Sequence, residues 1–467
     1  MLLGAVFDRF VEESPLSVMS RATIEHALSA SALDALFEHT AETGYTQELL
    51  FSTVVELMSR VVCGKAHHVQ SADQHMVDRI PVTLKSVYEK LQNIELGVSA
   101  GLVRRIADRC HERIGRLGGE RDPVRPGRAV RILDGNHLGA TQKRLRVTRG
   151  RTAGPLPGLV LAVLDPDRML ITDIIPCEDG HTQERALLDP VMPLVQPAQV
   201  WVGDRNFCTA EFLSRIDQRG TSFVIRRHGN TTLEGDGEWT AEVRTDTGRA
   251  SERPMWVCVG GEPVLQVRCV RVRLDQPTGD GDRELEILTN VPGDQADAAT
   301  VAAVYRGRWA VEGAFHELTV ALRCEVNTLG YPKAAVLGFA VAVAAYNVLA
   351  VLKAAMRAAH GVDVVQNEVS GYYVALELAT VYPGMMIAVP PAQWAVFGAM
   401  SGVELARHLR AWAEKINLKK VKKSPPRKPT KTKTERVEDK ILHVSTARLL
   451  ADDKKNRQSQ KRQQKRQ

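Results

Sequence analysis

The sequence lacks the cysteine spacing of a zinc ribbon or of a disulfide framework. Its seven cysteines are scattered over 467 residues, and no Cys-x-x-Cys pair occurs among them. Zinc ribbons and disulfide-rich domains both need cysteines in pairs at characteristic spacing, so the scattered cysteines support neither kind of domain. An odd number of scattered thiols fits a reducing, cytoplasmic compartment.

The sequence also has little that suggests a membrane. The N-terminal segment MLLGAVFDRFVEESP reaches acidic residues too early for a secretory signal. One apolar run, Ala334 to Leu352, is long enough to cross a bilayer. Ala and Val dominate this run and it contains Asn347, so we expect a buried helix of a large core and no membrane partner. A membrane span is the alternative, which cell fractionation would test.

Positive charge is scarce in most of the chain and concentrated at its end. Residues 418–467 hold 18 Lys and Arg against 5 Asp and Glu, whereas the remainder holds 44 against 50. The net charge of +7 therefore comes from the tail. A basic, Pro-broken segment of this kind is typical of a disordered tail, which either binds nucleic acid or only increases solubility.

The pattern of apolar residues divides the chain into six predicted regions. Residues 1–124 show helical periodicity and form a helical N-terminal region, possibly a DNA-binding domain. Residues 125–229 alternate short apolar runs with helical segments, including a predicted helix over 182–195. The order of three strands, helix, strand and helix is that of an RNase H-like fold, by analogy. It predicts the first part of a catalytic core.

In the second half of the chain, a predicted insertion separates the first part of the core from its second part. Residues 230–284 alternate polar and apolar positions and predict a β-rich insertion. Residues 285–358 predict the second part of the core, residues 359–417 a helical C-terminal region, and residues 418–467 the basic, disordered tail. The predicted fold class is therefore α/β: an RNase H-like mixed sheet core with a β-rich insertion, flanked by helical N-terminal and C-terminal regions.

The segment YRGRWAVEGAFHELTVALR, residues 305–323, reads as one helix with two distinct faces. At about 100° per residue, an apolar stripe contains Val304, Val311, Phe315, Leu318 and Leu322. The opposite stripe gathers Tyr305, Arg308, Trp309, Glu312, His316, Thr319 and Arg323. A solvated face normally carries Lys and Glu pairs, so this stripe indicates a functional surface around Glu312.

Two aspartates follow apolar strands and could meet that glutamate. Asp134 ends the run AVRILDG and Asp204 ends QVWVGDRNF, although each alone could be a turn or a helix cap. Carboxylates at neighbouring strand ends converge, and three of them repel one another unless a cation neutralises them. Oxygen ligands favour Mg²⁺ or Mn²⁺, and two such ions cleave phosphodiesters. Arg308 and Arg323 would then bind phosphate.

These motifs resemble those of DDE transposases of bacterial insertion sequences, in the family named for the fourth insertion sequence. That family carries Tyr-x-x-Arg-x-x-x-Glu-x-x-x-x-x-x-Lys, and Tyr305, Arg308 and Glu312 match it. The segments ILDGNHLGATQKRL and VWVGDRNF resemble its first and second aspartate motifs, and the β-rich insertion is a family feature. The resemblance covers about residues 125–355. One position departs from it, since Thr319 stands where the signature has Lys.

The resemblance implies cut-and-paste transposition by a two-metal mechanism. Asp134, Asp204 and Glu312 would be catalytic and would bind two Mg²⁺ or Mn²⁺ ions. DNA-binding residues would be Tyr305, Arg308, Trp309, Arg323, Trp239 and Trp256. The two insertion tryptophans would stack a flipped base, although ordinary sheet aromatics are the simpler interpretation. Arg323 would replace the missing Lys.

The implied partners are double-stranded DNA, as terminal inverted repeats and target DNA, and a second copy in a synaptic homodimer. The implied location is the bacterial cytoplasm, with nucleoid association on DNA. Two alternatives stay open. The first is a catalytically inert, transposase-derived DNA-binding protein or regulator, which Thr319 favours and the intact carboxylates oppose. The second is an RNase H-like nuclease without strand transfer.

Overall fold

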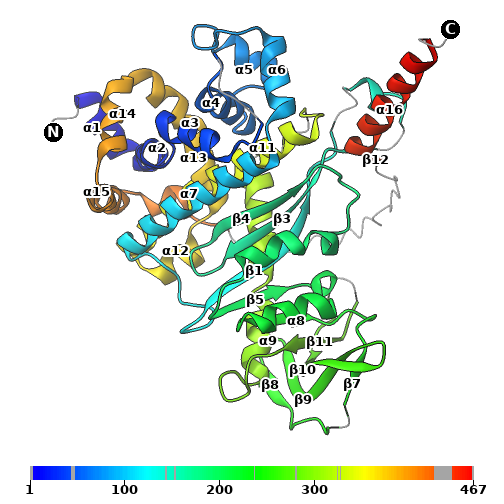
Figure 1. The fold of residues 1–467 in the computed structure, drawn as a ribbon. Coiled ribbons are helices and arrows are strands. Elements are labelled where there is room, and N and C mark those ends of the chain that lie inside the picture. Colours follow the sequence, from blue (N-terminus) through cyan, green and yellow to red (C-terminus); the bar gives the residue numbers. More distant parts are fainter. Residues whose placement is uncertain are drawn as a thin grey trace.

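In the computed structural model, the structure describes residues 4–43, 48–141, 145–151, 154–235, 237–278, 281–322, 324, 326, 328–424 and 444–464. One mixed sheet of ten described strands runs through the molecule in the order β4-β3-β1-β5-β6-β11-β10-β9-β7, with β8 paired to β9 (Figure 1). Its first five strands along this order are β4 (Leu170–Cys177), β3 (Leu159–Asp165), β1 (Ala129–His137), β5 (Gln199–Gly203) and β6 (Ser222–Arg226).

The direction of the strands changes at β1. Strand β1 is antiparallel to β3, and β3 is antiparallel to β4. On its other side β1 is parallel to β5, and β5 is parallel to β6. Helix α8 (Ala210–Gln218) forms the connection between β5 and β6. The observed mixed sheet with surrounding helices agrees with the predicted α/β class, and it brings the carboxyl ends of β1 and β5 to the same edge.

The predicted insertion extends the core sheet. It contains β7 (Leu233–Glu234), β8 (Val243–Thr245), β9 (Gly248–Val259) and β10 (Glu262–Leu274). Strand β11 (Glu284–Thr289) pairs with both β10 and β6, so hydrogen bonds run without a break from the core into the insertion. The lower part of Figure 1 shows these strands beside α8. The insertion and the candidate site therefore share one rigid sheet.

A long apolar helix, α11 (Pro332–His360), lies at the centre of the helical half and packs on α7 (Leu96–Leu117) and β4. By length and composition it could cross a membrane, but 89% of its most apolar window is buried inside the fold. The one polar side chain noted in this run, Asn347, has a structural partner. Its amide accepts the backbone N–H of Ile171 (3.0 Å) and donates to the C=O of the same residue (2.9 Å). The helix thus covers the edge strand β4, as expected of a core helix.

The two helical regions at the ends of the sequence share one hydrophobic cluster. Phe7 packs against Trp394, Phe397 and Trp412, with ring centroids 5.2, 5.9 and 6.2 Å away. The N-terminal helices are α1 (Ala5–Glu13), α2 (Pro15–Ala27), α3 (Ala30–Thr40), α4 (Phe51–Val62), α5 (Val69–Gln74) and α6 (Leu84–Asn93), followed by α7. The C-terminal helices are α12 (Val362–Glu368), α13 (Gly371–Ala388), α14 (Pro391–Ala399) and α15 (Gly402–Glu414).

Two predictions about local structure are wrong. Residues 182–195 form the short 3₁₀ helices η2 (Glu184–Leu187) and η3 (Asp189–Leu194) rather than one α-helix, because Pro190 and Pro193 cannot donate the backbone hydrogen bonds of an α-helix. The tail is also partly ordered. It contains η6 (Leu418–Val421), β12 (Val444–Ser445) and helix α16 (Thr446–Gln464), whereas residues 425–443 lie outside the described residues.

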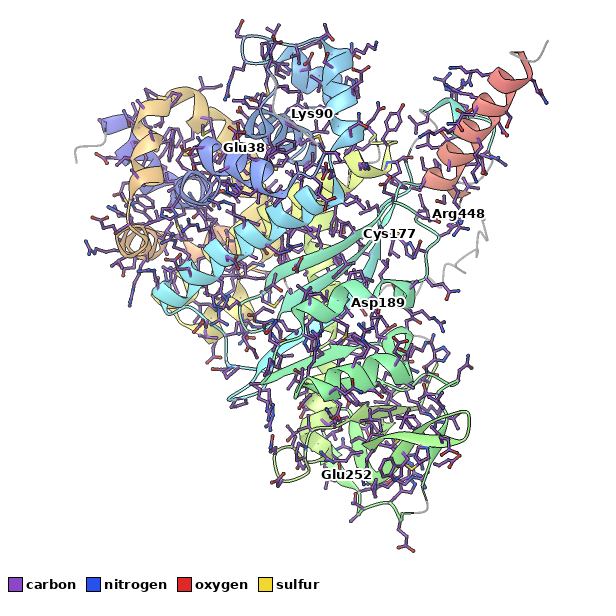
Figure 2. All side chains as sticks on the ribbon, viewed as in Figure 1. Glu38, Lys90, Cys177, Asp189, Glu252 and Arg448 are labelled. Atoms are coloured by element: carbon purple, nitrogen blue, oxygen red, sulfur yellow. The ribbon has the colours of Figure 1, made fainter. Side chains whose placement is uncertain are left out.

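Helix α16 projects from the body of the molecule and is attached in its N-terminal half, where Asp453 also pairs with Arg146 (3.6 Å). Strand β12 pairs in parallel with β2 (Pro155–Leu156), and Arg448 forms an ion pair with Asp179, just beyond the Cys177 end of β4 (Figure 2). Beyond this attachment, Lys454, Lys455 and Lys461 are exposed. The ordered part of the tail is therefore a basic helix held at one end.

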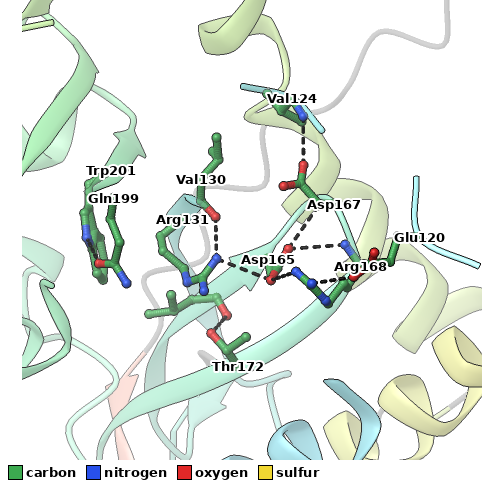
Figure 3. A network of polar contacts seen from close by, with 11 residues as sticks. Glu120, Val124, Val130, Arg131, Asp165, Asp167, Arg168, Thr172, Gln199 and Trp201 are labelled. Carbon is green, nitrogen blue, oxygen red and sulfur yellow. Dashed lines mark hydrogen bonds and ion pairs between the residues drawn. The ribbon is translucent and has the colours of Figure 1, made fainter. Parts of the chain in front are cut away.

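A buried carboxylate at the end of β3 has a structural role. Asp165 is 1% exposed and pairs with Arg131 (3.3 Å) and Arg168 (3.4 Å), while its Oδ1 accepts the backbone N–H groups of Asp167 and Arg168 (Figure 3). These contacts fix the turn between β3 and β4. Every oxygen of Asp165 is already used, which distinguishes it from the acidic residues at the opposite end of β1.

Candidate active site

Asp134 and Asp204 lie side by side at the edge of the sheet. In the parallel pair of β1 and β5, Leu133 stands opposite Gly203, the last residue of β5. Asp204 follows directly after β5, and Asp134 is the next residue of β1, at the point where its pairing with β5 ends and only its pairing with β3 continues to His137. Asp134 accepts the backbone N–H of Gly135 (3.0 Å). Asp204 caps the 3₁₀ helix η4 (Arg205–Phe207) by accepting the backbone N–H of Asn206 (2.8 Å). The expected convergence of the two strand ends is therefore present.

The segment expected to be one helix over residues 305–323 is broken twice. Helix α9 (Ala298–Arg306) ends before Gly307, α10 spans Trp309–His316, and Glu317–Ala321 forms the π-helix η5. At the first break the backbone N–H groups bond the carbonyl three residues back instead of four, as Arg308 N–H does with Tyr305 O (2.9 Å). At the second, Leu322 N–H bonds Glu317 O, five residues back. The prediction of an unbroken helix is wrong.

Arg308 connects the third carboxylate to the first. Its Nη1 lies 3.3 Å from Asp134 Oδ2, and its Nη2 donates to Glu312 Oε1 at 2.7 Å. Val311 and Ala314 pack inward and hold α10 against the core beside β1. The Arg308 and Asp134 side chains are 13% and 15% exposed, whereas Glu312 is 55% exposed. One guanidinium therefore contacts two of the three predicted catalytic residues and offsets only part of their charge.

The same contact bears on a metal site. Within the part of the chain that the structure describes, no three His, Cys, Asp or Glu side chains are grouped to hold a metal ion. Arg308 supplies the positive charge between Asp134 and Glu312. The chemistry of the donors nevertheless fits a hard cation, because Asp134 and Asp204 present oxygen ligands at adjacent strand ends. Glu312 could join them through Oε2, since Arg308 contacts only its Oε1.

The electrostatics of Asp134 indicate an excess of negative charge. Burial, the main cause, and the nearby carboxylates of Asp204 and Glu184 together raise the pKa of Asp134 to about 7, although Arg308 lowers it in part. A second cation near this carboxylate would restore its charged form. The raised pKa of Asp134 is thus the property of this site that best fits a positively charged ligand.

Glu184 is a carboxylate of the site that the sequence did not reveal. It begins η2, and its side chain packs so closely over Gly135 that a Cβ added there would lie 1.9 Å from Glu184 Oε1. Its Oε2 accepts a hydrogen bond from Asn206 Nδ2 at 2.9 Å. No local motif marks Glu184, because its position depends on the chain folding back across the ends of β1 and β5.

Tyr305 and Arg308 face the carboxylates rather than solvent. Tyr305 is 9% exposed, and burial raises the pKa of its hydroxyl while Arg308 and Arg226 oppose this. Burial also disfavours the charge of Arg308, but Tyr305, Asp134 and Glu312 together raise the pKa of Arg308 above its usual value. The Nε–H of Arg308 is buried without a hydrogen-bond partner among the described residues. This donor is therefore unpartnered in the structure, although it is buried from solvent.

The remaining members of the predicted stripe are divided between two environments. Trp309 is 56% exposed, at the start of α10. Thr319 lies exposed on the π-helix, and its hydroxyl donates to the backbone oxygens of Phe315 (3.1 Å) and His316 (3.3 Å). Arg323 lies outside the described residues. The prediction that Arg323 replaces the missing Lys stays a prediction.

The two tryptophans of the insertion differ in their availability. The ring of Trp239 carries the guanidinium of Arg271 at 3.9 Å and that of Arg253 at 4.6 Å from its centroid. Trp256 on β9 is 42% exposed. The contacts of Trp239 agree with the simpler interpretation of a sheet aromatic, and Trp256 is the one with an open face.

Comparison with known proteins finds a similarity over the part of the chain that holds this site. Residues 125–348 match the model described as the transposase DDE domain. The matched DDE domain begins just before β1 and ends within α11, so it contains Asp134, Glu184, Asp204 and Glu312. The prediction of a DDE transposase domain is confirmed at this level. The insertion-sequence-four family and its Tyr-Arg-Glu-Lys group stay predictions.

A solved structure resembles the chain beyond the DDE domain. It is described as the cryo-EM structure of piggyBac transposase synaptic complex with hairpin DNA. The sequence identity is 11%, the match covers 92% of this chain and 90% of that chain, and the TM-score is 0.40. No curated protein matches the sequence.

Proposed function

We propose that this protein is a DDE transposase that cleaves DNA at the ends of a transposable element and joins those ends to target DNA. The observation that carries the proposal is the pairing of Asp134 with Asp204 at adjacent strand ends, linked through Arg308 to Glu312, inside the matched DDE domain. The strand order and directions of β4-β3-β1-β5-β6 further support an RNase H-like core.

In this proposal each group has a distinct task. Asp134, Asp204 and Glu312 would hold two Mg²⁺ or Mn²⁺ ions, which supply a nucleophile and stabilise the leaving oxygen of the phosphodiester. In this proposal Glu312 exchanges its contact with Arg308 for the metal. Arg308 is then released to hold a phosphate oxygen, for which its unpartnered Nε–H is suited. Tyr305 orients Arg308 from the buried side.

The partners follow from the same reaction. We propose double-stranded DNA as substrate, with terminal inverted repeats flanking the gene as the specific ends, and a homodimer in the synaptic complex. Cytoplasmic location with nucleoid association on DNA is part of this proposal. The basic helix α16 and the arginines near the site support a polyanionic partner.

Cleavage of DNA that carries the flanking repeats would test this function. The wild type is expected to nick and join such DNA in Mg²⁺ or Mn²⁺, and Asp134→Asn, Asp204→Asn and Glu312→Gln are each expected to lose cleavage and retain binding. Cleavage at the wild-type rate by any one of them removes that residue from the site. Nicking without joining would instead identify a nuclease.

Metal binding can be measured without activity. Mg²⁺ or Mn²⁺ is expected to raise the unfolding temperature of the wild type, since a ligand that binds only the folded state stabilises it. The same ion should leave Asp134→Asn unchanged. An equal shift in both proteins would show that the ion binds elsewhere.

The inert, transposase-derived DNA-binding protein is the second candidate, and Thr319 is the observation that favours it. We expect Thr319→Lys to tighten binding to the repeats and to steepen its salt dependence, because the position is exposed and makes no packing contact that a Lys would disturb. Val320→Lys, which adds the same charge to the next exposed position, is the control. Binding without cleavage by both the wild type and Thr319→Lys supports this second candidate.

A further inference from the structure

A cavity of about 270 Å³ lies directly beside the candidate active site. Its walls come from the start of α8 and the turn η4, from the loop after β6, and from the end of β9. Residues that matter for its chemistry are Arg185, Arg205, Asn206, His228, Asn230 and Cys258. The cavity therefore lies between the catalytic core and the insertion, where the function proposed above gives it no role.

The two arginines of the cavity are available for a ligand. Both side chains are exposed, and neither forms a hydrogen bond or an ion pair with any residue that the structure describes. The carboxylate of Asp282 forms its ion pair with Arg226 at 2.6 Å, and it attracts Arg205 only through longer-range electrostatics. Other arginines of this part of the chain have acidic partners, such as Arg227 with Glu286. Two guanidiniums at one cavity without a contacting acidic partner among the described residues indicate an anionic ligand.

A third donor comes from the loop after β6. His228 Nδ1 accepts the backbone N–H of Asn230 at 3.1 Å, so the hydrogen of the neutral imidazole resides on Nε2. Asn230 and His228 both line the cavity. The lining thus offers donors on the arginine side and the smaller, less polar surface of Cys258 and Val259 on the other. One phosphate with its attached sugar and base matches this division.

The position of the arginines in the sequence relates the cavity to the reaction. Arg185 follows Glu184 and Arg205 follows Asp204, and in both cases the acidic residue belongs to the candidate active site. The hydrogen bond from Asn206 Nδ2 to Glu184 Oε2 joins the two segments between site and cavity. A strand whose scissile phosphate lies at Asp134 and Asp204 would place a neighbouring phosphate at the cavity.

We propose that this cavity binds the nucleotide next to the scissile phosphate of the DNA strand being cut, with Arg185 and Arg205 on its phosphate. This inference rests on the proposed function for the position of the scissile phosphate. It adds a binding site for one deoxynucleotide, and it makes the insertion strand β9 a part of the substrate path.

The test uses the full chain and a fluorescent single-stranded oligodeoxynucleotide. Removing both charges with Arg185→Gln and Arg205→Gln is expected to weaken binding about tenfold at low salt and to lower the slope of log affinity against log salt by about 0.7, the value for one phosphate. The control, Arg244→Gln with Arg249→Gln, removes two exposed arginines of β8 and β9 that already have acidic partners. A slope that is unchanged in the first variant, or lowered equally in both, overturns the proposal.

A second measurement locates the nucleotide. An oligonucleotide that contains 5-iododeoxyuridine is expected to crosslink, under ultraviolet light, to the peptides around His228 or Cys258. Thr232→Trp, which fills the cavity without changing charge, should abolish that crosslink. Crosslinks confined to other peptides would contradict the proposal.

The two proposals fail separately. If the wild type cleaves repeat DNA but the double arginine variant binds and crosslinks normally, the cavity has no role and the transposase function stands. If no divalent ion supports cleavage but the crosslink forms at the cavity, nucleotide binding stands and the enzymatic function fails.

Discussion

At the scale of single residues, the buried pair of Asp134 and Arg308 determines how the protein responds to pH. Because the folded state raises the pKa of Asp134 to about 7, this carboxyl keeps its proton in the folded protein at pH values where the unfolded chain has lost it. The contribution of Asp134 to stability therefore falls as pH rises from about 4 to 7 and stays lower above that. The effect reaches at most about 4 kcal/mol, from roughly three pKa units at 1.36 kcal/mol each.

Asp134→Asn should remove this dependence. In buffer without divalent ions, we expect the variant to be more stable than the wild type at pH 8, and the difference to shrink toward pH 4. Urea unfolding followed by circular dichroism at both pH values measures it. A variant that is equally or less stable at pH 8 would show that Arg308 fully compensates the charge.

The individual site residues were predictable where a strand end or a helix face marks them. Asp134 and Asp204 follow apolar runs, and Glu312 lies on a face with Tyr305 and Arg308. Glu184 was not predictable, since it meets Gly135 only through the fold. Arg308 was expected to bind DNA, and in this structure it binds the two carboxylates instead.

At the scale of secondary structure elements, α11 stabilises the edge of the sheet through one side chain. Asn347 is fully buried and satisfies both backbone groups of Ile171. Asn347→Leu has similar volume but leaves an N–H and a C=O buried without partners. We expect a loss of about 2–6 kcal/mol in the free energy of unfolding, at about 1–3 kcal/mol for each group.

The matched control for this variant is Asn93→Leu. Asn93 ends α6, is exposed, and bonds only the backbone oxygen of Glu89. Its replacement should change stability by less than about 0.5 kcal/mol. Equal effects of the two variants in chemical unfolding would mean that Ile171 finds water or another partner.

Elements with strong periodicity were predictable, and their interruptions were not. The strands β1, β3, β4, β5, β6 and β9 to β11 were expected close to where they occur. The predicted helix over 305–323 is interrupted at Gly307, where hydrogen bonds span three residues, and again at Glu317, where they span five. Helical periodicity alone does not report such changes, because the apolar stripe continues through them.

At the scale of the whole molecule, the basic tail has two parts with different roles. Residues 418–424 belong to the fold: Val421 is fully buried, and the N–H of Ser370 bonds its backbone oxygen at 2.8 Å. Helix α16 extends outward and exposes its lysines. The predicted tail, which begins at residue 418, therefore includes a segment that packs on the core. A truncation that leaves the core intact must begin after residue 424.

A chain ending at Ser424 should fold like the full protein and bind DNA with a lower dependence on salt, because it has lost the basic helix. A chain ending at Asn417 should in addition unfold at a lower temperature, since it loses Val421. Anisotropy titrations at several salt concentrations and thermal unfolding measure both. An unchanged salt slope for the chain ending at Ser424 would show that α16 does not touch DNA.

The hydrophobic cluster shared by the two helical ends also determines how long α1 stays without its packing partners during synthesis. Phe7 packs on Trp394, yet 387 residues separate them in the sequence. At roughly 5–20 residues per second of synthesis, α1 waits about 20–80 seconds on the ribosome for its partner. During that interval its apolar face has nothing from the C-terminal helices to cover it. Any chain that terminates before residue 394 keeps that face uncovered permanently, so incomplete copies are expected to be cleared by chaperones and proteases.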